Sequence, residues 1–262
     1  MPRFKLTIEY TGTRYSGWQI QTNARTIQGE LARAIQQVTR RKEFELYGAG
    51  RTDAGVHALA QIAHLDVYTS LPPRTLRDRI NELLPADIHV NDAAGVPHRF
   101  HARHDARSRS YLYQVSRRKT AFFKPYVWWV KEALNVDAMR IAAAAFVGLK
   151  PFDSFTVDEP DEKSLKVLID RVEIAEDGAL VLLRVVGSHF LWRMVRRMAG
   201  VLVAVGRGEL AHGDVAGLFD MKSDIPATLT APASGLFLEG VYYRDGEGPG
   251  PLSAPVRVPR FD

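Results

Sequence analysis

The segment at residues 48–58, GAGRTDAGVHA, holds the combination of side chains in this sequence that is best suited to chemistry. Arg51, Asp53 and His57 lie there among glycines, which let the backbone turn sharply and let a large ligand approach closely. An aspartate in such a turn most often only bonds to nearby backbone amides, so this structural interpretation competes with a catalytic one. A Walker-type phosphate loop is excluded, because valine follows Gly55 where that motif needs lysine and a hydroxyl residue.

If Asp53 is catalytic, its carboxylate could act as a covalent nucleophile. A partly buried aspartate tends to protonate, and a nearby guanidinium, which stays charged at any relevant pH, favours its anionic form. A glycosidase needs a second carboxylate as acid or base, yet the nearest downstream acid, Asp66, lies 13 residues away near the end of an expected strand. The sequence near Asp53 therefore offers no second carboxylate of the kind that a glycosidase needs.

Three histidines, His98, His101 and His104, recur every third residue, which is a spacing that could suit metal ligands. They fall in an extended or irregular segment without a pattern of partner carboxylates. The chain has no cysteine, whereas structural zinc sites usually include thiolates. We therefore predict no metal site, and we expect these imidazoles to contact phosphate or backbone.

Positive charge is concentrated in residues 99–124, which contain eight basic residues and one acid and so carry +7, while the rest of the chain sums to −2. This concentration suits a surface that binds a polyanion, since each neutralised phosphate releases counterions. The alternative is a solvated basic face. Aromatic residues that are able to stack on unpaired bases, or to fill a core, are interleaved with these charges: Phe100, Tyr111, Tyr113, Phe122 and Phe123.

Hydrophobic periodicity predicts the elements that must position these residues. Strands are expected at residues 4–8, 56–67, 88–94, 110–116, 166–174, 179–186 and 236–243. Helices are expected at residues 26–40, 73–84, 136–147 and 190–205, with Thr26 and Asn135 as N-terminal caps. Asp53 then lies in a turn that leads into a strand.

The last of these helices is predicted to carry basic residues on one face and apolar residues on the other. Arg193, Arg196 and Arg197 share the basic face. For Arg193 and Arg197 two interpretations stay open, namely contact with phosphates or a solvated basic stripe.

Interspersed strands and helices in two comparable halves indicate an α+β fold, with two similar α/β sandwich halves and mainly antiparallel sheets flanking a central basic cleft. The predicted ranges are 1–106 for the half with the Asp53 loop and 107–243 for the half with the arginine helix. Residues 244–262, rich in Gly and Pro, are expected to form an extended tail, and the acidic segment 158–163 a mobile loop.

The composition narrows the class of protein. Hydrophobic residues make up 46% and charged residues 25% of the 262, which are values that exclude a disordered or fibrous chain. Without cysteine there is no disulfide framework and no cysteine nucleophile. The apolar runs are too short to cross a bilayer, and the first residues alternate like a strand rather than a signal peptide. We predict a soluble, cytoplasmic protein with no membrane partner.

Several blocks of the sequence resemble the tRNA pseudouridine synthase A family. GRTDAGVHA resembles the catalytic motif of that family. The other matching blocks are YTGTRYSGWQIQ followed by TIQGELARAI, then FHARHDARSRSYLY, FLWRMVRRMAG and SGLFLEGVYY. They occur in the expected order from one end of the chain to the other. The sequence departs from the family at Arg193 and Arg197, where many relatives have polar or histidine residues.

The resemblance implies a role for four residues and the pseudouridine synthase fold. Asp53 matches the catalytic aspartate, and Tyr111 matches the tyrosine that contacts the substrate. Arg51 matches the arginine that helps to hold the displaced RNA, and Arg196 matches the basic partner of the aspartate.

The resemblance further implies a homodimeric isomerase that converts uridine to pseudouridine at positions 38, 39 and 40 of the tRNA anticodon stem-loop. Two sites of attack by Asp53 stay open, C1′ and C6 of uridine. The uridine must leave its stack for Asp53 to reach it. No cofactor is required, because the isomerisation leaves the composition of the nucleoside unchanged. Two alternatives remain, a non-catalytic RNA-binding module and a nucleoside hydrolase that uses an aspartate nucleophile and releases free uracil.

Overall fold

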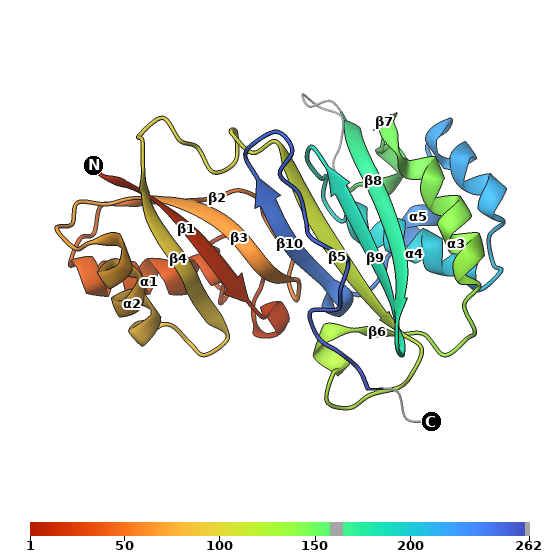
Figure 1. Cartoon of the computed structure of the whole chain (residues 1–262), viewed down its shortest axis with the longest axis horizontal. Coiled ribbons are helices and arrows are strands. Elements are labelled where there is room, and N and C mark those ends of the chain that lie inside the picture. The colour runs from red at the N-terminus through yellow and green to blue at the C-terminus, as the bar shows by residue number, and fades with distance from the viewer. Residues whose placement is uncertain (158–164, 260–262) are drawn as a thin grey trace. The chain divides into compact units, whose positions relative to one another are not determined.

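Residues 1–157 and 165–259 are described by the computed structural model and form an α+β fold with mixed strand pairing (Figure 1). The chain divides into two compact units. The first comprises residues 1–107 and 237–248, and the second comprises residues 108–236 and 249–262. These ranges differ from the predicted ones at the C-terminus, because the last strand pairs within the sheet of the first unit.

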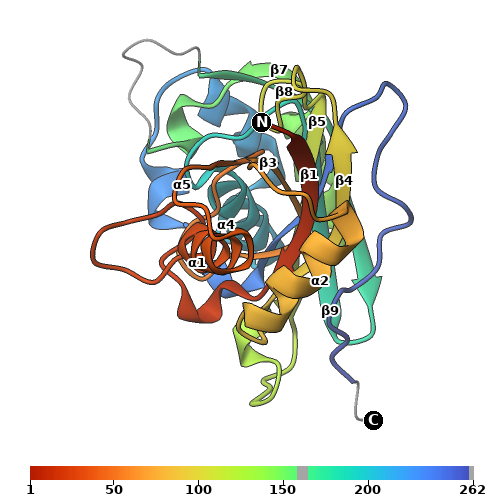
Figure 2. The same cartoon turned by 90° about the vertical axis from the view of Figure 1, so that its left-hand side faces the viewer.

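In the first unit the strands pair in the order β4-β1-β3-β10, and β2 also pairs with β3. The bounds are β1 (Arg3–Tyr10), β2 (Glu45–Gly48), β3 (His57–Asp66), β4 (Ile88–Val96) and β10 (Leu236–Tyr242). β1 runs antiparallel to β3 and β4, whereas β10 runs parallel to β3. Two helices, α1 (Ile27–Thr39) and α2 (Pro73–Leu83), pack against each other beside this sheet (Figures 1 and 2).

Local sequence signals account for the start of this unit. Along β1 the apolar side chains of Phe4, Leu6 and Ile8 are buried while the residues between them are not, which confirms the predicted alternation. Helix α1 begins after Thr26, whose hydroxyl oxygen accepts a hydrogen bond from the N–H of Gly29, 3.2 Å away. The predicted cap is therefore confirmed, and it satisfies one of the N–H groups that a helix start leaves unpaired.

In the second unit the order is β5-β9-β8-β7, with antiparallel neighbours, and β6 pairs parallel to β5. The strands are β5 (Ser108–Ser116), β6 (Trp128–Trp129), β7 (Gly148–Pro151), β8 (Lys166–Asp177) and β9 (Leu180–Gly187). The helices are α3 (Val136–Ala143), α4 (Met194–Gly206) and α5 (Ile225–Thr228). The Asn135 cap and the β8–β9 hairpin are confirmed, with Gly178 at φ 57° in the hairpin turn.

The arginine helix is shorter than predicted. Instead of starting at residue 190, α4 starts at Met194, because Arg193 has φ 61°, a left-handed conformation that a right-handed helix cannot include. Residues 190–193 thus lie in the turn before the helix, and the prediction that Arg193 shares a helical face with Arg196 is wrong.

The Pro- and Gly-rich tail has no helix or strand through residue 259, as predicted, yet residues 249–259 belong to the second compact unit. Arg184 of β9 is only 2% exposed, and it donates hydrogen bonds to the carbonyl oxygens of Gly250 and Pro251 at 3.0 and 3.4 Å. Val258 is buried as well. The tail thus supplies the carbonyl acceptors that a buried guanidinium needs.

Segment 158–163, expected to form a mobile loop, lies outside the described residues. Within residues 1–157 and 165–259 there is no helix with the length and apolar character that crossing a membrane requires.

Candidate functional site

Asp53 lies in the loop that connects β2 to β3, two strands that run antiparallel. The loop closes through backbone hydrogen bonds, from the N–H of Ala49 to the oxygen of Ile62 at 2.7 Å and from the N–H of Val56 to the oxygen of Asp53 at 3.1 Å. The Asp53 side chain is half-buried and Arg51 is exposed. A turn of this kind presents a carboxylate to a ligand on a backbone that is fixed at both ends.

The loop is also clamped by the segment that follows β1. The backbone N–H of Trp18 donates to the carbonyl oxygen of Thr52 at 3.1 Å, and the backbone N–H of Gly55 donates to the carbonyl oxygen of Tyr15 at 3.3 Å. The hydroxyls of Tyr10 and Thr52 lie 2.8 Å apart in a buried hydrogen bond. These contacts lie on both sides of Asp53 and hold its backbone in place.

Two glycines make this clamp possible, and sequence reasoning assigned them no role. A Cβ on Gly12 would lie 2.0 Å from the carbonyl oxygen of Val56. Gly17 has φ 89°, and a Cβ there would lie 2.5 Å from the oxygen of Thr52. The pair of glycines in YTGTRYSGW is the signal in the sequence. It indicates a close backbone approach, but it does not identify the segment that is approached.

His57, which the sequence offered as a residue that could take part in chemistry, has a structural role in the loop. Its ring is 1% exposed and stacks on Phe237 with the ring centroids 4.8 Å apart. Its Nδ1 accepts the N–H of Gly12 at 3.1 Å, so the hydrogen of the neutral ring is on Nε2.

Tyr111 and Arg196 belong to the second unit, whereas Asp53 and Arg51 belong to the first. Tyr111, on β5, is 9% exposed, and its ring lies edge-on to Phe190 at 4.9 Å between centroids. Arg196, on α4, is half-buried, and its Nε donates to the carbonyl oxygen of Ala231 at 2.7 Å. The orientation of this guanidinium is therefore set by the backbone of residue 231.

Helix α4 packs closely against residues 229–231, the segment whose backbone accepts the hydrogen bond from Arg196. A Cβ on Gly200 would lie 1.7 Å from the carbonyl oxygen of Leu229, and the N–H of Ala231 donates to the oxygen of Arg196 at 3.1 Å. The neighbouring Tyr113 is fully buried and donates its hydroxyl to Pro232 at 2.7 Å. Burial raises the pKa of the Tyr113 hydroxyl well above its usual value, so that hydroxyl stays protonated.

Both interpretations left open for Arg197 are wrong. Its side chain is 9% exposed, and Nη1 donates to the carbonyl oxygens of Ser154 and Thr156 at 3.0 and 2.5 Å. Burial lowers the pKa of this guanidinium, and the nearby charge of Arg193 adds to the effect. Arg197 is thus a structural residue that ties α4 to residues 154–156.

The basic segment 99–124 is divided between the two units after residue 107, so it is not one continuous face of one unit. Arg109 donates to the carbonyl oxygen of Ser188 at 2.6 Å, and Arg118 donates to that of Pro259 at 3.1 Å. Tyr111 and Tyr113 are buried. Several of these side chains therefore have internal partners, which charge counting cannot reveal.

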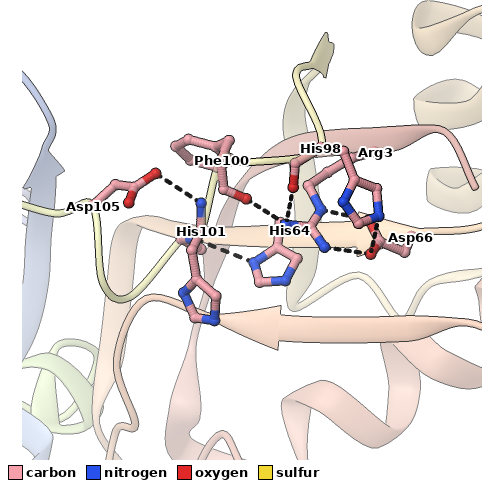
Figure 3. Close-up of polar contacts among 8 residues, drawn as sticks. Arg3, His64, Asp66, His98, Phe100, His101 and Asp105 are labelled. Carbon is pink, nitrogen blue, oxygen red and sulfur yellow. Dashed lines mark hydrogen bonds and ion pairs between the residues drawn. The ribbon is translucent and has the colours of Figure 1, made fainter.

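The predicted backbone contacts of the histidines are confirmed at His101, which belongs to a cluster on the first unit (Figure 3). The His101 Nδ1 accepts the N–H groups of Arg103 and His104 at 3.1 and 3.2 Å, and the His64 Nδ1 accepts that of Ala102 at 3.1 Å. Among the residues that the structure describes, no three His, Asp or Glu side chains are arranged to hold a metal ion.

This cluster predicts a loss of stability in acid. Burial, with help from the charges of Arg3 and His101, lowers the pKa of His64 to about 4, below its unfolded value of 6.5. Between these values the unfolded chain binds a proton that the folded chain does not, so the free energy of unfolding should fall as the pH drops from about 6.5 to about 4. Urea unfolding across this range should show a smaller fall for His64→Gln than for the wild type. Equal falls in the two proteins would contradict this assignment.

The sequence of this chain matches known proteins over most of its length. A family model described as tRNA pseudouridine synthase matches residues 6–105 and 142–244. A protein named tRNA pseudouridine synthase A from Rhodopseudomonas palustris is 42% identical over 93% of this chain and 100% of its own length. Proteins of the same name from Citrifermentans bemidjiense and Pseudothermotoga lettingae are 39% and 37% identical over 94% and 92% of this chain, and over 99% of their own lengths. Matches of this extent, with the Asp53 loop inside the matched region, show that the chain belongs to the tRNA pseudouridine synthase family.

Proposed function

We propose that this protein is an isomerase that converts uridine to pseudouridine in tRNA, at positions 38, 39 and 40 of the anticodon stem-loop. The observation that carries this proposal is the backbone clamp on both sides of Asp53, in the loop whose sequence resembles the catalytic motif of the family. A lone carboxylate on a fixed turn suits covalent attack on a nucleoside. We further propose a cytoplasmic homodimer with a central basic cleft for the tRNA.

In the proposed reaction Asp53 attacks uridine at C1′ or C6, and the bond between N1 and C1′ breaks. The base turns, a bond forms between its C5 and C1′, and the bond between the nucleoside and the Asp53 carboxylate breaks, which regenerates the free carboxylate. The hydrogen on C5 is lost to water while N1 gains a proton. Arg196 acts as the basic partner of the aspartate, Arg51 holds the displaced RNA, and Tyr111 contacts the base. No atom is added to or removed from the nucleoside overall, so no cofactor takes part.

One assay separates this proposal from the two alternatives. Unmodified tRNA carrying tritium at C5 of uridine is incubated with the enzyme, and both tritium in water and free uracil are measured. The isomerase should release tritium without uracil, whereas a hydrolase should release labelled uracil. Release of neither would indicate an RNA-binding module.

Replacement of Tyr111 by phenylalanine tests the role of its hydroxyl. The ring should keep its edge-on contact with Phe190, so the fold and the affinity for tRNA should change little. If the hydroxyl moves a proton in the reaction, single-turnover pseudouridine formation should slow by roughly a hundredfold. An unchanged rate would limit Tyr111 to stacking on the base.

A further inference from the structure

A small hollow of about 90 Å³ lies beside the Asp53 loop, entirely within the first unit. Its walls come from β2, from the loop itself, from the residues before α1, from the first turn of α1 and from the turn at residues 101–105. The lining residues are Trp18, Gln19, Gln28, Tyr47, Gly48, Gly50, Arg51 and Arg103. Nothing in the proposed roles of the four site residues accounts for Arg103 or for the hollow.

The charge of the hollow indicates an anionic ligand. Two exposed guanidinium groups, those of Arg51 and Arg103, line it, and its described lining includes no carboxylate. Guanidinium groups are always charged, and their planar donors match the oxygens of phosphate in pairs. Two like charges that share one hollow attract an anion more strongly than either does alone.

The size of the hollow restricts that anion to a single group. Pockets for whole drug-sized molecules begin at about 300 Å³, so a hollow of about 90 Å³ suits a phosphate rather than a complete nucleotide. The walls are preformed. Trp18 is 1% exposed and lies so close to β2 that a Cβ on Gly48 would be 2.7 Å from its indole ring. The Gln28 side chain is held by the N–H of Ile20 at 3.1 Å and by the oxygen of Leu46 at 2.8 Å.

Arg103 is carried on a turn whose backbone is bonded at nearly every residue (Figure 3). The N–H of His101 donates to the Asp105 carboxylate at 2.8 Å, and the N–H of Asp105 donates back to the oxygen of His101 at 3.1 Å. Both backbone polar groups of Ala102 are hydrogen-bonded. Its N–H donates to His64 Nδ1, and its carbonyl oxygen accepts a hydrogen bond from the Tyr243 hydroxyl at 2.7 Å. The turn thus fixes the point from which the Arg103 side chain extends.

The same imidazoles connect this turn to the wall of the hollow. The Tyr47 ring stacks on His64 at 5.7 Å between centroids and meets His101 edge-on at 5.1 Å. Burial lowers the pKa of both imidazoles, so both rings are neutral at pH 7 and their Nδ1 atoms stay available as acceptors for the turn. Arg103 therefore lines the hollow from a preorganised support.

We propose that this hollow binds a backbone phosphate of the tRNA next to the uridine that is modified, with Arg51 and Arg103 on either side of it. The location follows from the loop, because Arg51 and Asp53 are two residues apart and their Cα atoms are at most about 7 Å apart. This inference rests on the proposed function. It adds Arg103 as a substrate-binding residue and a phosphate as the group bound.

The first test compares two arginines that precede β5. Arg103→Gln should weaken binding of unmodified tRNA about tenfold, and it should reduce the slope of log affinity against log salt by about 0.7 to 0.9. Arg99→Gln removes the same charge from a neighbouring exposed position that does not line the hollow, so it should weaken binding less. Equal losses in the two variants would overturn the site in favour of a general effect of charge. Circular dichroism and thermal unfolding check that both variants are folded.

A second test identifies the phosphate directly. Neutral methylphosphonate linkages are placed one at a time on either side of the target uridine, and binding is measured with wild-type protein and with Arg103→Gln. One linkage should weaken binding to the wild type and have a much smaller effect on Arg103→Gln, since the two changes remove the same contact. Additive losses at every linkage would overturn the proposal, as would no loss with the wild type.

Failure of this inference can be told from failure of the proposed function. If the wild type releases tritium from C5-labelled tRNA while the linkages and Arg103→Gln act independently, the isomerase stands and the phosphate site falls. If a linkage couples to Arg103 but the wild type releases no tritium, the hollow binds RNA and the proposed catalytic function falls.

Discussion

Asp53→Asn is expected to form no detectable pseudouridine while it keeps the wild-type fold. The amide is nearly isosteric with the carboxylate but is a far weaker nucleophile, so the covalent step is lost. The loop should survive, because backbone groups of Thr52, Gly55 and Val56 make the hydrogen bonds that hold it. The affinity for tRNA should stay the same or rise slightly, since an anion near phosphates is removed. Tritium release and direct binding measurements on the same preparation check both expectations.

Two controls make this result decisive. The variant is purified from a host without its own synthase of this family, so that residual product cannot come from contamination. Its thermal unfolding is compared with that of the wild type. Substantial pseudouridine formation by a folded, pure Asp53→Asn protein would refute the assignment of Asp53 as the nucleophile.

Gly12→Ala is expected to be both destabilised and nearly inactive, although residue 12 carries no functional group. The new Cβ would lie 2.0 Å from the Val56 oxygen, a backbone atom that cannot move without displacing the Asp53 loop. Overpacking of this kind costs about 1 to 3 kcal/mol of the free energy of unfolding. A shift of the nucleophile by about 1 Å costs roughly a hundredfold in rate. Urea unfolding and single-turnover assays measure the two effects.

Gly95→Ala is the matched control, because a Cβ on Gly95 has no neighbour within 4 Å. It makes the same change in a strand of the same unit and should keep near wild-type stability and turnover. A Gly12→Ala protein with wild-type turnover would show that the clamp does not position Asp53.

Local features of this protein could be predicted from its sequence. The cap at Thr26 depends on residues three positions away, and the buried alternation of β1 depends on a repeat of two, so both were correctly predicted. The turn that carries Asp53 was marked by its own glycines, and the four site residues were named through motifs that are contiguous in the chain. The roles of those four residues remain predictions that the mutants above test.

Only the tertiary structure decided which side chains are buried and what holds them. Arg197 looked like a solvated or phosphate-binding residue, but residues 154 and 156 bury it, and they lie more than 40 positions earlier. The tertiary structure also decided three other features: the pairing of β10 with β3, the contact of Gly12 with the Asp53 loop, and the hydrogen bond between His64 and the turn that carries Arg103. Each depends on segments that meet only after folding, because a side chain's environment is set by its neighbours in space, whereas hydrophobic periodicity records only its neighbours along the chain.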